Sequence, residues 1–323
     1  MKPPLIMYHA HCADGFGAAF AAWKKFGSSA DYVAVEYNKP IPVPYEDRDV
    51  YVLDFSFSKE ITAHLLETTN KLIWLDHHKS AFENWCGEYY PGKLHVMEAV
   101  VPTDSSSYIC LDDTRSGALI AWEYFHPEDA VPTLIRHIDD YDRWQFKLPG
   151  TKEFIKSLWA YTPWTFEFFD DSLNFERVEE MISEGAAILR AHNQNVDAVV
   201  AATELPCTIT WFEQVEISNQ FDIPYKKLVS SQEVGAVGLA ANCPAHLTSD
   251  VGTKLALKSG TYGLCWFQRA DSKINCSLRS SGNYDVSAIA KRFGGGGHKN
   301  AAGFTVASMS QLQKWFYPDR RSI

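Results

Sequence analysis

Three apolar segments in the first 80 residues each end in side chains that can bind a metal ion. His9 ends the run LIMYH, Asp54 follows DVYVL, and Asp76, His77 and His78 follow KLIWL. Short apolar runs of this kind are typical of strands buried on both faces of a parallel sheet. The carboxyl ends of such strands meet at one edge of the sheet, where ligands bind. The sequence therefore predicts a functional site at that edge.

The chemistry of these side chains favours a divalent cation. Asp14, in HCADGFG, and an acid of the segment IDDYD complete the set, and Asp139, Asp140 and Asp142 are the alternatives in that segment. If IDDYD is helical, Asp139 and Asp142 share a face. Imidazole mixed with carboxylate suits manganese better than it suits a structural zinc. A central carboxylate can bridge two ions about 3.5–4 Å apart, a geometry that activates water for attack on phosphorus. A single strand-end aspartate is more often a helix cap, but several at one edge favour a metal centre.

A second candidate site is the glycine run near the end of the chain. Gly294 to Gly297 remove side chains and permit positive φ, so that backbone amides can converge on an anion. His298 and Lys299 follow directly, and Arg279, in SLRSSG, can add a bidentate phosphate contact. The alternative is a flexible glycine loop with solvated cations. Disorder is not expected between a predicted helix, DVSAIAKRF, and a predicted strand, GFTV.

Composition limits the class of protein. The chain has 323 residues, enough for two domains, and its seven cysteines are scattered without a C-x-x-C pair, which favours a reducing cytoplasm. No run of 18 apolar residues and no signal-peptide layout is present, so we expect no membrane span. The net charge is −10, but residues 1–204 hold 17 Lys and Arg against 32 Asp and Glu, whereas residues 205–323 hold 13 against 8. An acidic metal-binding half and a basic phosphate-binding half would produce this division.

The order of patterns predicts an α/β fold in two domains. Strand and helix patterns alternate over the first 80 residues, which indicates a mostly parallel sheet with helices on both faces. Helical patterns dominate from about residue 115 to 202, and the last of them serves as a helical linker. Strand patterns return after Pro206. We therefore predict a metal-binding domain over residues 1–203 and a smaller α/β domain over residues 204–323.

Five motifs in this order resemble those of the DHH phosphoesterase superfamily. LDHHKS resembles its signature, and FGGGGHKNAAG resembles the glycine-histidine motif of its DHH-associated C-terminal domain. HCADGFGAA, LDFS and HIDDYDRW resemble the first, second and fourth motifs, so the resemblance spans residues 9–303. It implies a two-domain enzyme with two manganese ions in the first domain, and with substrate held by the second; magnesium and cobalt are alternative metals.

The resemblance also implies roles for individual residues. Asp54 would bridge both metals, with His9 on one of them. Asp14, His77 and Asp140 would complete the other. Asp76 would orient His77, and His78 would face the scissile phosphate, so that Asp54, Asp76, His77 and His78 form the catalytic group. A phosphate or terminal nucleotide would be bound by Arg279, Gly295, Gly296, Gly297 and His298. The chain departs from the pattern at Cys12, where the family usually has an aspartate, which places the first metal site in question.

The function expected from these observations is hydrolysis of a phosphodiester by a metal-activated water. Short single-stranded oligonucleotides and linear or cyclic dinucleotides are the expected substrates, because the acidic first domain disfavours a tight grip on long duplexes. Two alternatives are a polyphosphatase or nucleotide phosphatase, and a nucleotide-binding sensor with weak catalysis. The protein is expected to be cytoplasmic, with no membrane partner, and a homodimer is an open alternative. The aromatic segment LWAYTPWTFEFF is either core or a stacking wall for bases.

Overall fold

The computed structural model describes residues 2–37, 39–87, 95–100, 106–218, 224–232 and 237–316. The chain divides into two compact units, one up to Leu189 and one from Arg190 onward. The long helix α8 (Phe175–Thr203) contributes residues to both units. The boundary that the sequence predicts, between residues 203 and 204, coincides with the end of this helix and stays a prediction.

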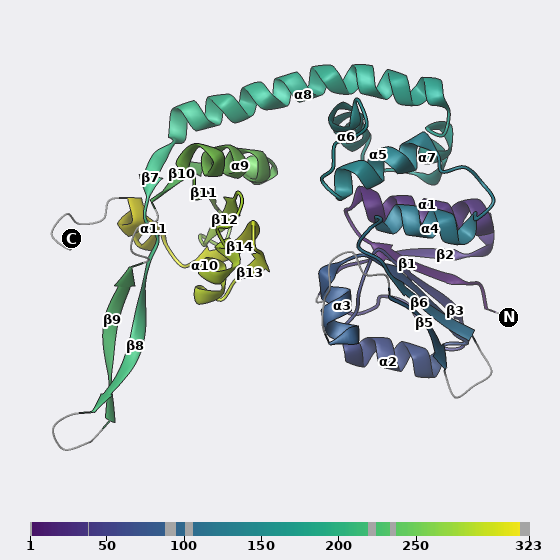
Figure 1. Ribbon diagram of the computed structural model, residues 1–323, viewed down its shortest axis with the longest axis horizontal. Helices are drawn as coiled ribbons and strands as arrows, with labels where there is room; N and C mark the ends of the chain where they lie inside the picture. The colour runs from purple at the N-terminus through teal and green to yellow at the C-terminus, as the bar shows by residue number, and fades with distance from the viewer. Residues whose placement is uncertain are drawn as a thin grey trace. The chain divides into compact units, whose positions relative to one another are not determined.

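The first unit is built on a six-stranded sheet in the order β2-β1-β3-β4-β6-β5 (Figure 1). Every neighbouring pair is parallel except β5 and β6, which are antiparallel. The prediction of a mostly parallel sheet is thereby confirmed. The strands are β1 (Leu5–His9), β2 (Asp31–Val35), β3 (Asp49–Leu53), β4 (Lys71–Asp76), β5 (His95–Val100) and β6 (Ser106–Leu111).

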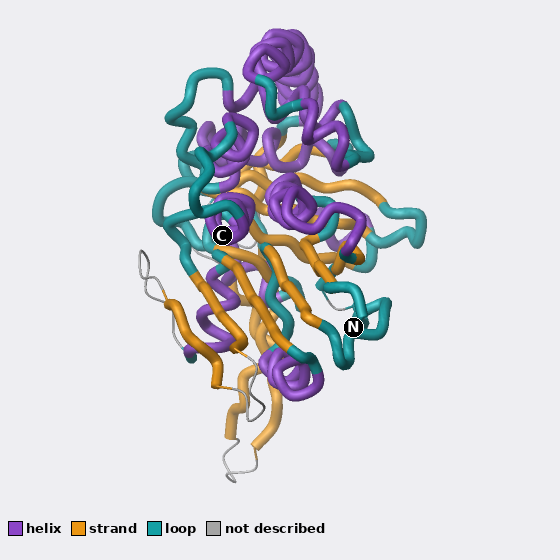
Figure 2. Tube along the Cα trace, turned by 90° about the vertical axis from the view of Figure 1, so that its right-hand side faces the viewer, coloured by secondary structure: helices purple, strands orange, loops and turns teal. Residues whose placement is uncertain are grey.

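Helices cover both faces of this sheet, as the alternation of strand and helix patterns predicts (Figure 1, Figure 2). Successive side chains of β4 enter different cores: Ile73 and Leu75 pack with one set of helices, and Leu72 and Trp74 with the other. One face carries α1 (Ala13–Phe26), α4 (Gly117–Phe125), α5 (Thr133–Asp142), α6 (Thr151–Ala160) and α7 (Phe166–Asp171). The other carries α2 (Lys59–Thr68) and α3 (Lys79–Cys86), and a short 3₁₀ turn, η1 (Gly27–Ser29), follows α1.

Small side chains let α1 pack tightly in the first core. Ala18, Ala19, Ala21 and Ala22 are fully buried, and a Cβ atom at Gly17 would lie 2.9 Å from Ala118 Cβ of α4. A close approach of two helices requires such small residues where the backbones are nearest. This packing brings the N-terminal ends of α1 and α4 together beside the strand ends.

The second unit is a smaller, mostly antiparallel sheet in the order β13-β14-β12-β11-β10-β7. One face packs on α9 and the last turns of α8, and the other packs on α10 and α11. A separate hairpin joins β8 (Thr210–Ser218) to β9 (Pro224–Gln232). The remaining elements are β7 (Leu205–Cys207), β10 (Gly238–Asn242), η2 (Ala245–Leu247), α9 (Thr248–Ser259), β11 (Tyr262–Gln268), β12 (Ile274–Ser280), α10 (Val286–Arg292), β13 (Gly296–His298), β14 (Ala301–Val306) and α11 (Met309–Phe316). None of the described helices combines the length and the apolar character that a membrane span requires.

We expect Gly185→Ala to destabilise the first unit. A Cβ atom at this position of α8 would lie 1.8 Å from the carbonyl oxygen of Glu153 in α6, so one helix must shift. The free energy of unfolding should fall by about 1–3 kcal/mol, the usual cost of overpacking, although alanine favours a helix over glycine by about 1 kcal/mol. Chemical denaturation measures the change. Ser183→Ala, at an exposed position of the same helix, is the control and should not destabilise.

Candidate metal centre and substrate surface

The strand ends place His9, Asp54 and His77 around one point at the carboxyl edge of the first sheet. His9 Nδ1 lies 3.5 Å from Asp54 Oδ2, and His77 Nε2 lies 3.2 Å from Asp54 Oδ1. Asp54 follows β3 directly, and its amide donates to the carbonyl oxygen of Leu75 in β4. Pairing between parallel strands, rather than loop geometry, therefore sets these distances.

Asp14, in the first turn of α1, joins the cluster from the helical side. Its Oδ2 is 3.3 Å from His77 Nε2 and accepts the amide of Gly117, while its Oδ1 accepts the amide of Ala118. These amides belong to the N-terminal turn of α4, where free N–H groups and the helix dipole favour a negative charge. Burial alone would raise the pKa of Asp14, but His77 and the amide donors outweigh it and lower the pKa to about 2.

Two glycines make room for the cluster. A Cβ atom at Gly117 would lie 2.5 Å from Asp54 Cβ, and one at Gly15 would lie 2.3 Å from the carbonyl oxygen of His9. Asp54 itself has a φ of 53°, a left-handed conformation that is uncommon for a residue with a side chain. Strained backbone of this kind is concentrated at functional sites.

Asp76 fixes the two histidines that follow it. Its Oδ1 accepts the backbone amides of His77 at 2.7 Å and His78 at 3.1 Å, and lies 2.7 Å from His78 Nδ1. The sequence interpretation gave Asp76 the task of orienting the His77 side chain. In the structure Asp76 holds the His77 backbone and the imidazole of His78. The His77 imidazole is surrounded instead by Asp14, Asp54 and Asp142.

The segment IDDYD supplies Asp142 to the cluster, and not the predicted Asp140. Asp142 Oδ2 lies 3.4 Å from His77 Nε2, and Asp142 forms a compact group with Asp14 and His77. The carboxylate of Asp140 points the other way and accepts the amides of Lys147 and Leu148. We therefore replace Asp140 by Asp142 in the proposed ligand set.

The other two acids of the segment have structural partners. Asp140 also accepts the hydroxyl of Thr151, so it ties the end of α5 to the start of α6. Asp139 Oδ1 accepts the backbone amide of Ser116 at 2.7 Å, and Asp139 Oδ2 lies 3.6 Å from a guanidinium nitrogen of Arg143. Asp139 and Asp142 share a face of α5, as the helical spacing predicts, and only Asp142 reaches the cluster.

Several buried polar atoms at this site lack a hydrogen bond of acceptable geometry. Within the described part of the chain these atoms include His9 Nδ1, both carboxylate oxygens of Asp54, Asp76 Oδ2 and His77 Nε2. Buried polar groups are almost always paired, so this group of unpaired imidazole and carboxylate atoms is a candidate ligand set. A divalent cation fits the imidazole and carboxylate donors present.

The pKa shifts within the cluster also favour the binding of a cation. Burial and then the charge of Asp14 raise the pKa of Asp142 to about 7, and the same two causes raise the pKa of Asp54. Burial lowers the pKa of His77, but the surrounding carboxylates outweigh it and hold the pKa well above its usual value. Carboxylates this close repel one another, and a bound cation would relieve that repulsion.

Cys12 lies in the cluster, as its place in the first motif predicts. It groups with His9 and Asp54 at the end of β1, where its sulfur is one of three atoms that could hold an ion. Burial, followed by the charges of Asp54 and Asp14, raises the pKa of the Cys12 thiol well above its usual value. Cys12 offers sulfur where the corner formed by Asp14, His77 and Asp142 offers two carboxylates, and oxygen donors suit Mn²⁺ better than sulfur does.

In the second unit, Arg279 and His298 lie in one row across three strands. Arg279 of β12 pairs with Ala301 of β14, and Ala301 pairs with His298 of β13. Directly paired residues point to the same face of a sheet, so both side chains share a face with only the methyl group of Ala301 between them. His298 is exposed, whereas Arg279 is partly covered and bonds to the carbonyl oxygen of Leu278.

The glycine run is ordered by the sheet rather than free. Gly294 has a φ of 72° and Gly297 a φ of 136°, which a larger residue would adopt only with strain. A Cβ atom at Gly295 would lie 2.1 Å from the carbonyl oxygen of Gly303, whereas Gly296 faces open space. The run therefore forms a thin, exposed edge next to the row of Arg279 and His298, where an anion can approach backbone amides.

We expect Asp142→Asn to weaken binding of Mn²⁺ about 10-fold or more, because it removes an anionic donor from the cluster. Asp140→Asn should leave the Mn²⁺ affinity unchanged. It should lower the free energy of unfolding by about 1–3 kcal/mol, because buried donors lose a charged acceptor. Isothermal titration and chemical denaturation of the two variants measure both quantities. Equal loss of Mn²⁺ affinity in both variants would contradict the assignment of Asp142.

We expect Gly117→Ala to impair the same site by a different route. The added methyl group must displace the Asp54 carboxylate, so Mn²⁺ binding should weaken about 10-fold while no donor is lost. Isothermal titration gives the affinity, and circular dichroism checks that the helices persist. A variant that stays folded with wild-type affinity would show that Asp54 can move without consequence.

Comparison with known proteins agrees with the sequence interpretation of the second unit. Residues 255–316 match the DHHA1 domain. The uncharacterized protein R106 of Acanthamoeba polyphaga mimivirus is 27% identical over 325 residues, which are 94% of this chain and 68% of the relative.

Among solved structures, the pGpG-specific phosphodiesterase PggH from Vibrio cholerae is similar with a TM-score of 0.49 and 12% identity, over 97% of this chain and 96% of that one. RecJ of Thermus thermophilus in complex with Mn²⁺ gives a TM-score of 0.40 at 12% identity, over 97% of this chain and 50% of RecJ. The match over residues 255–316 agrees with the predicted resemblance of the second unit to the DHH-associated C-terminal domain of the DHH phosphoesterase superfamily.

Proposed function

We propose that the protein is a metal-dependent phosphodiesterase that hydrolyses short oligonucleotides or linear or cyclic dinucleotides. The observation that carries this proposal is the cluster of unpaired imidazole and carboxylate atoms at the carboxyl edge of the first sheet. Such a cluster has no evident structural use, because it leaves like charges and unpaired acceptors buried together. The two-unit chain with a DHHA1 domain supports a phosphoester as the substrate.

The residues that would hold divalent cations lie on either side of Asp54. His9 and Asp54 would hold one ion, with Cys12 beside them, and the other would be held by Asp14, Asp54, His77 and Asp142. When bound, such ions polarise a phosphoryl oxygen and lower the pKa of a water molecule. Mn²⁺ is the proposed metal because the donors are mixed nitrogen and oxygen.

The chain's own groups position the substrate and balance its charge. Burial lowers the pKa of His78, but the charge and hydrogen bond of Asp76 outweigh it and raise the pKa to about 9. A cationic His78 beside the cluster would donate to a phosphoryl oxygen as negative charge develops there. Asp76 keeps that imidazole oriented through its 2.7 Å contact with Nδ1. Asp76 is therefore a positioning residue, and His78 would contact the substrate.

The second unit would supply contacts for a phosphate. Arg279 and the exposed His298 share a sheet face, and the backbone amides of Gly295, Gly296 and Gly297 lie at the adjacent edge. Guanidinium, imidazole and amide donors suit one or two phosphates, not a long polyanion, because affinity for polymers requires many such contacts. The excess of acidic residues in the first 204 residues also disfavours duplex binding. Both observations support short substrates.

We expect the purified protein with Mn²⁺ to hydrolyse a linear dinucleotide or a cyclic dinucleotide faster than a longer oligonucleotide or polyphosphate. Asp54→Ala should lower kcat at least about 1,000-fold, because Asp54 is the donor common to both proposed ion sites. Asp49→Ala is the matched control: Asp49 begins the same strand at the opposite edge of the sheet, and its loss should leave kcat unchanged. Chromatography of the products gives the rates.

Two outcomes of this panel would replace the proposal. Preferential hydrolysis of polyphosphate or of nucleoside monophosphates would identify a phosphatase instead. Tight binding of a cyclic dinucleotide without turnover would identify a nucleotide sensor, a function that sulfur of Cys12 in place of an oxygen donor would explain. Equal activity of Asp54→Ala and the unmodified protein would exclude the cluster as the catalytic site.

A further inference from the structure

A cavity of about 500 Å³ opens at the carboxyl ends of β1 and β2, beside the candidate metal centre. Four aromatic side chains line it: Tyr8, Phe16, Trp159 and Trp164. Its volume lies within the range of cavities that bind small ligands in proteins, about 300–1,000 Å³. The aromatic residues come from β1, α1, α6 and the segment between α6 and α7, all within the first unit.

The cavity is continuous with the cation cluster. His9 and Cys12 line the cavity and also belong to the group that includes Asp54. A ligand that fills the cavity therefore lies next to any phosphate bound at the cluster. In a nucleotide, the group adjacent to the phosphate and sugar is the base.

Contacts with the protein core fix two of the aromatic side chains that line the cavity, Trp164 and Phe16. Trp164 Nε1 donates to the carbonyl oxygen of Leu158 at 2.7 Å. Phe16 packs against the fully buried Phe169, with ring centroids 4.8 Å apart. Rigid aromatic rings lose little conformational entropy when a ligand stacks on them, so the cavity is prepared for a flat partner.

Trp159 differs from these anchored rings because it remains 40% exposed. Its ring centroid lies 4.7 Å from that of Trp164, on the wall of the cavity. The aromatic segment of the sequence thus divides into core residues such as Phe169 and a residue that offers its surface to solvent. An exposed tryptophan in a cavity next to a phosphate site is typical of a stacking platform for bases.

Polar groups lie at the rim of the same cavity. His11 Nε2 is 4.0 Å from Glu36 Oε1, and both residues line the cavity. His11 has a φ of 54°, a left-handed conformation that is uncommon for a residue with a side chain. Glu36 Oε1 also accepts Lys39 Nζ at 2.8 Å, so the His11 imidazole and the second oxygen of Glu36 are the groups left for the edge of a base.

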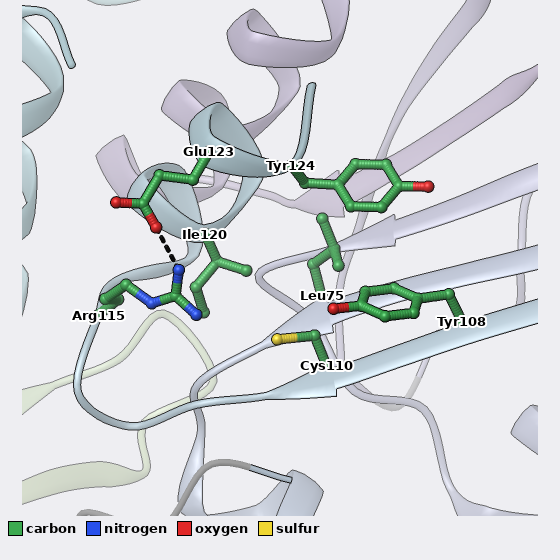
Figure 3. A pocket seen from close by; sticks show the side chains of 7 residues that line it. All are labelled: Leu75, Tyr108, Cys110, Arg115, Ile120, Glu123 and Tyr124. Atoms are coloured by element: carbon green, nitrogen blue, oxygen red, sulfur yellow. Dashed lines mark hydrogen bonds and ion pairs between the residues drawn. The ribbon is translucent and has the colours of Figure 1, made fainter. Parts of the chain in front are cut away.

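A second cavity in the same unit is a weaker candidate for a ligand site. It has a volume of about 310 Å³ and lies between β4, β6 and α4, with Tyr108 and Tyr124 at one end and Arg115 at the other (Figure 3). Arg115 is paired with Glu123 and with Asp112, so its charge is already satisfied within the protein. It also shares no residue with the cation cluster.

We propose that the cavity lined by Trp159 binds the nucleobase of the nucleotide whose phosphate occupies the metal centre. This inference rests on the proposed function and adds a base-binding site in the first unit to it. The base stacks on Trp159 and Trp164, and the pair of His11 and Glu36 contacts its polar edge. The cavity therefore distinguishes nucleotides from phosphate compounds that carry no base.

The test compares AMP with ribose 5-phosphate in the presence of Mn²⁺ by isothermal titration. AMP should bind the unmodified protein roughly 5- to 100-fold more tightly, the range expected for stacking of one base. Trp159→Ala should remove most of this difference, and Trp159→Phe should retain it because a stacking ring remains. Phe175→Ala, which removes a similarly exposed aromatic side chain outside the cavity, is the control and should retain the full difference.

Several results would overturn the inference. Equal affinities of AMP and ribose 5-phosphate for the unmodified protein would do so before any variant is made, as would failure of AMP to bind. A preference for AMP that survives in a folded Trp159→Ala protein would place the base elsewhere. If Trp159→Ala hydrolyses a dinucleotide with unchanged KM, the base site is wrong while the proposed phosphodiesterase function stands. Absence of hydrolysis in the unmodified protein, with AMP still preferred, would instead reject the proposed function.

Discussion

The first unit depends on a concentration of buried carboxylates whose charge the neighbouring imidazoles of His77 and His78 balance only in part. Asp14, Asp54, Asp76 and Asp142 approach one another at a single edge of the sheet, and the first three are almost completely buried. Burial of one carboxylate already costs free energy, and repulsion between neighbours adds to that cost. The sheet, the two glycines and the N-terminus of α4 are arranged so that this cost is tolerated, and a bound cation would reduce it further.

Backbone features share the task of tolerating this charge. The N-terminal amides of α4 bind Asp14, and Gly117 in the same turn leaves space for Asp54. The first turn of α4 therefore stabilises the carboxylate of Asp14 and leaves room for the carboxylate of Asp54. Asp139 in turn accepts the amide of Ser116 and so fixes the start of α4 relative to α5, which carries Asp142. The positions of three acids in the cluster are thus coupled through one turn of helix.

The sequence was sufficient to predict the strand-end residues but not the helical ones. His9, Asp54 and the pair His77 and His78 were predictable because parallel strands deliver their carboxyl ends to one edge. The acid of IDDYD that joins the cluster could not be predicted from the sequence. Helical periodicity places Asp139 and Asp142 on one face, but it does not show which of them contacts Ser116 instead of the cluster. The carboxylate of the predicted Asp140 is held away from the cluster by the amides of Lys147 and Leu148, and these contacts depend on the turn after α5. The sequence also did not show that residue 117 must be glycine. That requirement is visible only in the structure, where a Cβ atom at Gly117 would collide with Asp54.

The distribution of hydrogen bonds within the cluster indicates where a cation would gain most. Asp14 already accepts two amides, and His77, followed by the amide of Ala118, lowers its pKa against the effect of burial. Asp76 devotes one oxygen to three donors from His77 and His78. Asp54 has neither arrangement: both its oxygens are buried without a hydrogen bond, and its pKa is raised by burial and by Asp14. The largest electrostatic gain on cation binding therefore falls on Asp54, the residue between the two groups of donors. A carboxylate in that position can contact an ion on either side, which supports the proposed bridging role of Asp54.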